Sequence, residues 1–281
     1  MNTETKKETK KETKKTKTKK SRKGLGIVLT LIGLIWGGLT LKGLFVNGPE
    51  TDKVMADAVY VGTGKIDPAN DGKPVIVCGK LKVTKPAYDE KLKIALDVPR
   101  MGRSAQKLEL KEWNRPATEE NREWKSSVGD TAYFIGKADV GNYHLSDDFL
   151  ENIILYEKYK FDKKDLEKVG LTLVRERKNR GDTYIGVERM GDDYYKKGDR
   201  RYNYTVPKVE DGEMVTVFGI QDKDTIKHAQ GVLDNLQKGE LDRDTVIKGE
   251  ESSGREASVF AIVVSFLLLV PGIWMIVKSK K

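Results

Sequence analysis

Two apolar stretches decide the fold of this chain: LGIVLTLIGLIWGGLTLKGLFV at residues 25–46 and ASVFAIVVSFLLLVPGIWMIV at residues 257–277. The first has no charged residue from Gly24 to Leu41, and the second has none at all. Because a helix needs about 20 apolar residues to cross the hydrocarbon core of a bilayer, each stretch is long enough to span a membrane. We therefore predict transmembrane helices at 24–46 and 257–277, with one polar domain of 210 residues, 47–256, between them.

Basic residues are concentrated outside the two apolar stretches. Residues 1–23 hold eleven Lys or Arg and three Glu, a net charge of +8, and the tail at 278–281 adds three Lys. The two ends together carry a net charge of +11. Because the formal net charge of the whole chain is +9, residues 24–277 carry about −2. Since basic residues beside a spanning helix stay cytoplasmic, we expect both termini inside and the domain outside the cell or in a lumen. The near-neutral domain argues against nucleic acid as a partner.

The N-terminal region leaves two questions open. The first apolar stretch could be a cleaved signal peptide, but it is longer than the roughly 7–15 residues of a signal core and no small-x-small cleavage site follows it, so an uncleaved anchor is favoured. The tail at 1–23 repeats Thr-Lys-Lys-Glu and has no apolar residue after Met1, which predicts disorder. Its lysines either bind anionic lipid headgroups or only set the topology.

The region between the spans is predicted to be rich in strands. Alternating or β-branched runs predict strands at 75–83, 92–98, 131–135, 171–174, 183–187 and 214–220. Turn-forming pairs such as Asp71-Gly72 separate these runs. The segment VIVCG at 75–79 also resembles VTVFG at 215–219. A duplicated β lobe would explain this similarity, and so would a recurring pattern of strand and turn.

Short helices are expected beside the strands. Ser146 can cap a helix in which Asp147 and Asp148 suit the positive N-terminal dipole. Asp162 can cap another, and residues 230–256 predict one or two helices that lead into the second span. The sequence therefore predicts an α+β fold, a β-rich extracytoplasmic domain with short helices, flanked by two transmembrane α-helices.

Residues that could carry catalysis or bind metal are scarce. Cys78 is the only cysteine, so no internal disulfide can form, and a zinc site would need it together with His144 and His228, the only histidines. The chain lacks Gly-x-Ser-x-Gly, a phosphate-binding loop, His-Glu-x-x-His and Cys-x-x-Cys. We therefore predict no catalytic residue, no cofactor and no metal, although 43 Asp and Glu leave room for a carboxylate pair that no motif reveals.

A series of short motifs recurs in a fixed order between the two spans. Its positions are Asp67, Pro68, Asn70, Gly72, Gly79, Trp113, Trp124, Gly141, Leu145, Ser146, Gly198, Asp199, Arg201 and Gly239. In this order they resemble the LUMA family, also called transmembrane protein 43, over about residues 25–277, with Glu112 where the family has Gln before a tryptophan. The resemblance implies a protein that organises membranes or binds partners, with no catalytic residue to transfer. Relatives in eukaryotes have further spans, so a prokaryotic plasma membrane is expected rather than the endoplasmic reticulum or inner nuclear membrane.

Two of these motifs have a physical interpretation of their own. The run from Asn70 to Gly72 tolerates the left-handed turn that starts the next strand. Asp199 and Arg201 lie two residues apart, so on a strand they would share a face and could pair there. Such a pair would fix a hairpin, or Arg201 would hold a carboxylate of a partner.

The first predicted span carries small residues at helical spacing. They are Gly26, Thr30, Gly33 and Gly37. Small residues on one stripe let helix backbones approach closely in lipid, although glycine is also common in spans without such a role. The stripe is thus a candidate packing surface.

The function expected from the sequence is non-enzymatic. We expect an integral membrane protein with a scaffolding, membrane-organising or assembly role, whose partners are the lipid bilayer, including anionic lipids at the tail, and other membrane proteins or a second copy of itself. An extracytoplasmic hydrolase with an unrecognised carboxylate site and a ligand sensor are the alternatives. A pocket with converging acids would favour the hydrolase.

Overall fold

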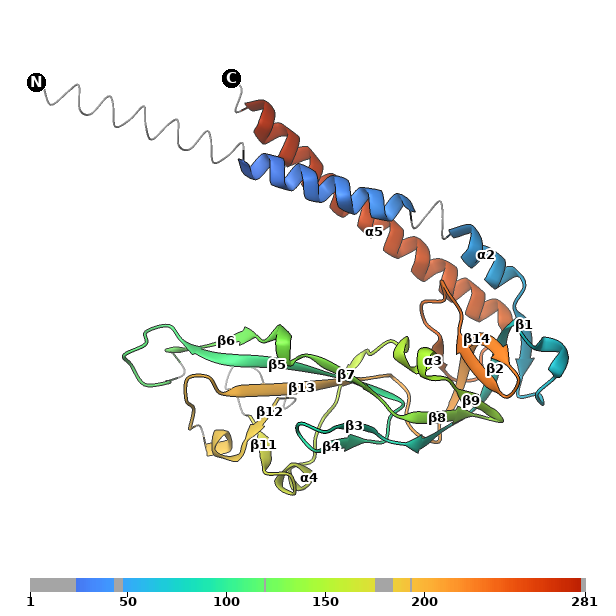
Figure 1. The fold of residues 1–281 in the computed structure, drawn as a ribbon, viewed down its shortest axis with the longest axis horizontal. Coiled ribbons are helices and arrows are strands. Elements are labelled where there is room, and N and C mark those ends of the chain that lie inside the picture. Colours follow the sequence, from blue (N-terminus) through green and yellow to red (C-terminus); the bar gives the residue numbers. More distant parts are fainter. Residues whose placement is uncertain (1–23, 43–47, 119, 175–183, 193, 279–281) are drawn as a thin grey trace, which may run out of the picture. The chain divides into compact units, whose positions relative to one another are not determined.

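The computed structural model describes residues 24–42, 48–118, 120–174, 184–192 and 194–278 (Figure 1). These residues form two compact units, one from the described residues up to Lys53 and from Ile247 onward and the other from those of Val54–Val246. The predicted α+β class is confirmed, since a β-rich body with short helices is accompanied by an apolar helix near each end of the chain. The Lys-rich tail at 1–23 and residues 43–46 of the first predicted span lie outside the described residues.

Helices form where the sequence offers caps or long apolar runs. They are an N-terminal helix (Gly24–Lys42), α2 (Gly48–Ala56), α3 (Asp147–Glu151), α4 (Lys163–Glu167) and α5 (Arg243–Lys278), with 3-10 turns η2 (Pro68–Asn70), η3 (Val128–Asp130) and η4 (Glu188–Asp192). As predicted, Ser146 caps α3 by accepting a hydrogen bond from the backbone of Phe149 at 3.4 Å. Asp162 likewise caps α4 through the backbone of Lys164 at 2.8 Å. The helix predicted over 230–256 is wrong in its first part, because a strand precedes α5 there.

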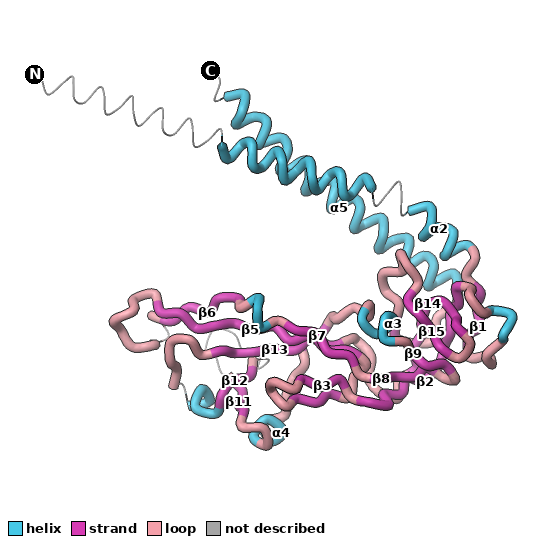
Figure 2. Tube along the Cα trace, in the orientation of Figure 1, coloured by secondary structure: helices cyan, strands magenta, loops and turns pink. Residues whose placement is uncertain are grey.

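One sheet closes on itself as a small barrel. Its strands are β1 (Val59–Gly62), β2 (Pro74–Lys85), β8 (Lys137–Val140), β9 (Tyr143–Leu145), β14 (Met214–Asp222), β15 (Thr225–His228) and β16 (Leu236–Lys238). Pairing runs from β2 through β8, β9, β15 and β14 and returns to β2, so these strands form a closed ring (Figure 2). Val77 and Val217 lie opposite each other at its centre and are fully buried. The two similar segments, 75–79 and 215–219, are thus direct neighbours, and duplication stays a prediction.

The second sheet is built on two long central strands. Its strands are β5 (Arg100–Leu110), β6 (Arg122–Ser126), β7 (Ala132–Ile135), β10 (Glu157–Lys158), β11 (Leu171–Leu173), β12 (Ile185–Val187) and β13 (Arg200–Val206). β5 and β13 are antiparallel, and β13 places Tyr202 and Tyr204 on one face and Asn203 on the other. The tyrosine face packs on a buried core to which the hairpin of β3 (Ala87–Asp89) and β4 (Ile94–Leu96) contributes. The opposite face is polar, and it positions the site described below.

Candidate binding groove

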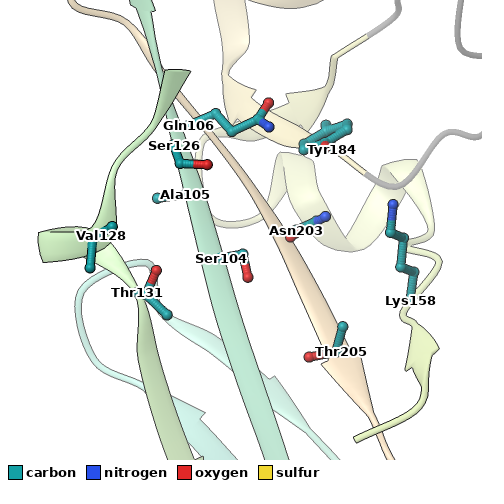
Figure 3. Close-up of a pocket in the computed structure, with 10 residues that line it drawn as sticks. All are labelled: Ser104, Ala105, Gln106, Ser126, Val128, Thr131, Lys158, Tyr184, Asn203 and Thr205. Atoms are coloured by element: carbon teal, nitrogen blue, oxygen red, sulfur yellow. The ribbon is translucent and has the colours of Figure 1, made fainter. Parts of the chain in front are cut away.

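A groove lies on the polar face of β5 and β13 (Figure 3). Its cavity has a volume of about 330 Å³. Hydroxyl and carboxamide side chains line it, namely Ser104, Gln106, Ser126, Thr131, Asn203 and Thr205, with Lys158 and Tyr184 at one side. Strand register explains this gathering, because Asn203 pairs with Ser104 and Thr205 pairs with Gly102, so their side chains share one face of the pleat. The arrangement can donate and accept hydrogen bonds without presenting a carboxylate, imidazole or thiol among the described lining residues.

Asn203 is the buried polar residue of this groove. Its side chain is 7% exposed, and its carboxamide makes no hydrogen bond within the part of the chain that the structure describes. Its amide atoms are not among the fully buried unpaired atoms of the described residues, so they open into the cavity, where water reaches them. A ligand in the groove can displace that water and pair with the amide.

The neighbouring amide, that of Gln106, has one of its two polar groups engaged in a hydrogen bond. Its carbonyl oxygen accepts a hydrogen bond from Nε of Arg201 at 2.7 Å, which leaves its NH₂ group free to donate to a ligand. The Arg201 guanidinium lies 4.0 Å from the ring centre of Tyr184 and 4.4 Å from that of Trp124. Two aromatic rings and one amide therefore fix Arg201 beside the groove.

The predicted pairing of Asp199 with Arg201 is wrong. Both carboxylate oxygens of Asp199 accept hydrogen bonds from Arg189, and one also accepts from the backbone of Lys196 at 2.7 Å. Asp199 precedes β13 and turns back toward η4, whereas Arg201 belongs to the strand. Burial alone would raise the pKa of Asp199, but the hydrogen bonds from Arg189 outweigh it and hold the pKa below its usual range.

The other face of β5 and β13 contains a buried ion pair, between Arg103 and Asp89. The Arg103 guanidinium and the Tyr204 hydroxyl both donate to one oxygen of Asp89, and the three residues are at most 5% exposed. Burial, followed by the hydrogen bond to Asp89, raises the pKa of Tyr204 far above its ordinary value. Its phenol therefore stays protonated and keeps donating to Asp89. This cluster stabilises the core of the second sheet and does not reach the groove.

The motif positions in the turn before β2 are structural. Asp67 caps η2 by accepting from the backbone of Ala69 at 2.9 Å, and Pro68 begins that turn. Asn70 ends it, and Gly72 follows with φ of +75°, a left-handed conformation that suits glycine. The backbone N–H of Gly72 donates to β14 at 2.8 Å, so the motif fastens the turn to the barrel.

Other motif residues also serve the fold. A Cβ on Gly79 would lie 2.6 Å from the backbone nitrogen of Gly141, so these two glycines let two segments of the barrel touch. Leu145 is buried in the barrel core. Gly198 and Gly239 adopt positive φ, and Trp113 is 82% exposed. Of the motif residues predicted from sequence, Trp124 and Arg201 lie closest to the groove, through their mutual contact. Asn203 and Gln106 were missed, although alternation of polar and aromatic residues in β13 indicates a strand with one polar face.

The small residues of the N-terminal helix face α5. A Cβ on Gly26 would meet the carbonyl oxygen of Gly272 at 2.8 Å, and one on Gly33 would meet Leu269 at 2.8 Å. Thr30 lies between them and donates to the carbonyl of Gly26 at 2.8 Å. At Gly37 the nearest atom, in Ser265, is 3.6 Å away. The stripe thus permits close packing of two helices of the same chain.

A second cavity, of about 430 Å³, borders Arg100, Tyr133, Glu151 and Asn152. Arg100 donates to the carbonyl of Ile153, lies 5.1 Å from the ring centre of Tyr133 and has its pKa lowered by burial. One guanidinium NH of Arg100 is therefore engaged by the protein, while its Nε is buried without a hydrogen-bond partner among the described residues. Among the residues that the structure describes, no cluster of His, Cys, Asp or Glu is placed to hold a metal ion.

The fold and the helices define a class of protein. Gly24–Lys42 and Val259–Lys278 are long and apolar enough to cross a bilayer, which makes this a membrane protein with two candidate spans and a β-rich domain. A profile of the family described as Transmembrane protein 43 matches residues 107–280, more than half of the chain. The chain belongs to this family. The match includes the motifs from Trp113 onward and not those at 67–79. No curated protein and no solved structure matches the chain.

Proposed function

We propose that this protein is a non-catalytic organiser of membranes. Its two helices anchor the β-rich domain beside the bilayer on the extracytoplasmic side, and the domain binds segments of other membrane proteins. Anchoring supports this role, because a domain held at the surface meets membrane-bound partners at high effective concentration. The basic residues outside both helices support the orientation, with both termini cytoplasmic.

The groove is the observation that carries the proposal. It is hollow, polar and lined by groups that form hydrogen bonds, yet its described lining offers no carboxylate, imidazole or thiol for general acid–base or nucleophilic chemistry. The hydrolase alternative needs two converging acids. The fully buried Asp89 is instead engaged by Arg103, and the partly buried Asp199 by Arg189. The groove therefore suits recognition better than reaction.

The test is site-specific crosslinking in native membranes. Benzoylphenylalanine placed at Ser126, on the rim of the groove, should crosslink to membrane proteins with extracytoplasmic segments, whereas the same group at exposed Lys82 of the barrel should not. Crosslinks to soluble cytoplasmic proteins would contradict the orientation. Turnover of a substrate by wild type, lost in a still-folded carboxylate variant, would contradict the non-catalytic role.

A further inference from the structure

We propose that the groove binds an extended peptide, neutral or acidic in charge, and that the Asn203 carboxamide holds one of its peptide groups. This inference rests on the proposed function and deepens it by naming the class of ligand. The groove lies on the face of an antiparallel strand pair, with Asn203 of β13 beside Ser104 of β5.

The first step is the chemistry of Asn203. A carboxamide carries a donor and an acceptor side by side, and a peptide group presents the complementary acceptor and donor. Both functions of Asn203 are unused within the described part of the chain, although the side chain is 93% buried, as its 7% exposure shows. One peptide group in the groove would satisfy both at once. A ligand that offers only donors or only acceptors would pair with only one of the two.

The second step is the row of groups around Asn203. The Gln106 NH₂ group can donate, since only its carbonyl is engaged, by Arg201. Hydroxyls of Ser104, Ser126 and Thr131 are exposed toward the same hollow (Figure 3). Hydroxyls donate and accept, so they match the alternating N–H and C=O groups of an extended backbone without selecting its side chains. The site thus recognises main chain more than sequence.

The third step is charge. Lys158 is the charged residue of the described lining, and no carboxylate there offsets it. An acidic side chain or a terminal carboxylate would be attracted to this end of the groove, whereas a basic peptide would be repelled. A neutral peptide would bind through hydrogen bonds alone.

The fourth step separates peptide from sugar. A sugar ring packs its C–H face on an open aromatic ring, and Tyr184 is the aromatic residue among the described residues that line the groove. Its ring is already approached by the Arg201 guanidinium at 4.0 Å and the Lys158 ammonium at 5.8 Å. These two cations compete with a sugar for the ring, while a peptide backbone needs no such platform.

The experiment uses the full chain in lipid nanodiscs. The probes are three fluorescent pools of N-acetylated heptapeptides, one neutral, one acidic and one basic, with maltoheptaose and chitohexaose as the sugar arm. The neutral and acidic pools should bind, and Asn203→Leu should weaken that binding about tenfold or more, the size expected for losing two hydrogen bonds. Gln237→Leu, on β16 of the barrel, should leave it unchanged. Asn203→Leu should keep its melting temperature, because it removes a polar group that has no partner.

Three results would overturn the inference. They are absence of peptide binding above the level of Asn203→Leu, binding that Asn203→Leu leaves intact, and binding of a sugar that Asn203→Leu abolishes. If peptides fail while the crosslinks from Ser126 to membrane proteins persist, the choice of ligand falls and the proposed function stands.

Discussion

Removing the Asp89 carboxylate should destabilise the β-rich domain more than any exposed ion pair could. Asp89 is fully buried and accepts four hydrogen bonds: from the Arg103 guanidinium, from the Tyr204 hydroxyl at 2.5 Å, and from the backbones of Lys91 and Leu92 at 3.0 and 3.4 Å. Asp89→Leu leaves Arg103 as a buried charge without its carboxylate and Tyr204 as a buried hydroxyl without its acceptor.

The magnitude follows from these lost partners. Breaking a buried ion pair by removing one partner costs about 3–5 kcal/mol. In a domain of this size each kcal/mol lowers the melting temperature by about 2–4 °C, so Asp89→Leu should lower it by roughly 10 °C. The assay is thermal unfolding of the full chain in detergent micelles, followed by near-UV circular dichroism. The double variant Asp89→Leu with Arg103→Met should recover much of the loss, because it removes both buried charges together.

A control on β5, the strand that carries Arg103, separates the effect of burial from that of charge. Glu109 of β5 pairs with Lys125 at 2.7 Å, but both side chains are exposed to solvent. Glu109→Gln should therefore leave the melting temperature unchanged within error. The reasoning is refuted if Asp89→Leu shifts the melting temperature no more than Glu109→Gln does, or if the double variant is as unstable as Asp89→Leu.

Two further predictions follow from local geometry. Gly33→Ala should weaken packing of the N-terminal helix on α5, since its Cβ would lie 2.8 Å from Leu269, whereas Gly38→Ala should not, since nothing lies within 4 Å of that position; cysteine crosslinking between the two helices in membranes measures this, and equal yields for both variants would contradict it. The hydrogen bond that Nδ1 of His144 donates to the Asp139 carboxylate raises the pKa of His144, so the stabilisation is fully present below about pH 6.5 and is lost as the pH rises through the folded pKa. Asp139→Asn should remove this part of the pH dependence of the melting temperature, and parallel curves for wild type and variant would refute it.

The fold class could be predicted from the sequence because its signals are local. Span length, strand alternation and the caps at Ser146 and Asp162 each depend on a few neighbouring residues. β5 was missed because its inward position Arg103 breaks the apolar alternation, and only the carboxylate of Asp89, on another strand, makes that position tolerable. β16 was missed because a strand of three residues has no usable period.

The candidate site was harder to predict for a related reason. The burial of Asn203 depends on the strands beside it, which a single sequence does not reveal. The pairing of Asp199 with Arg201 followed strand spacing, but the partner that Asp199 contacts, Arg189, comes from a 3-10 turn ten residues earlier in the chain. Spacing on an ideal strand cannot anticipate a side chain that folds back on its own loop.

The contrast between the two faces of β13 supports the proposal that the groove binds a ligand. Tyr204 and Asn203 are adjacent in sequence and both are buried, but they belong to opposite faces of one strand. On the first face Arg103 and Tyr204 both donate to Asp89, which accepts four hydrogen bonds in all. On the second face the Asn203 amide lies at the wall of a cavity and makes no hydrogen bond within the described residues. Its atoms open into the cavity, so water satisfies them in the empty groove and the fold does not depend on them. The first face thus stabilises the core of the second sheet, while the second presents an amide that the fold does not use and that is available to the proposed ligand.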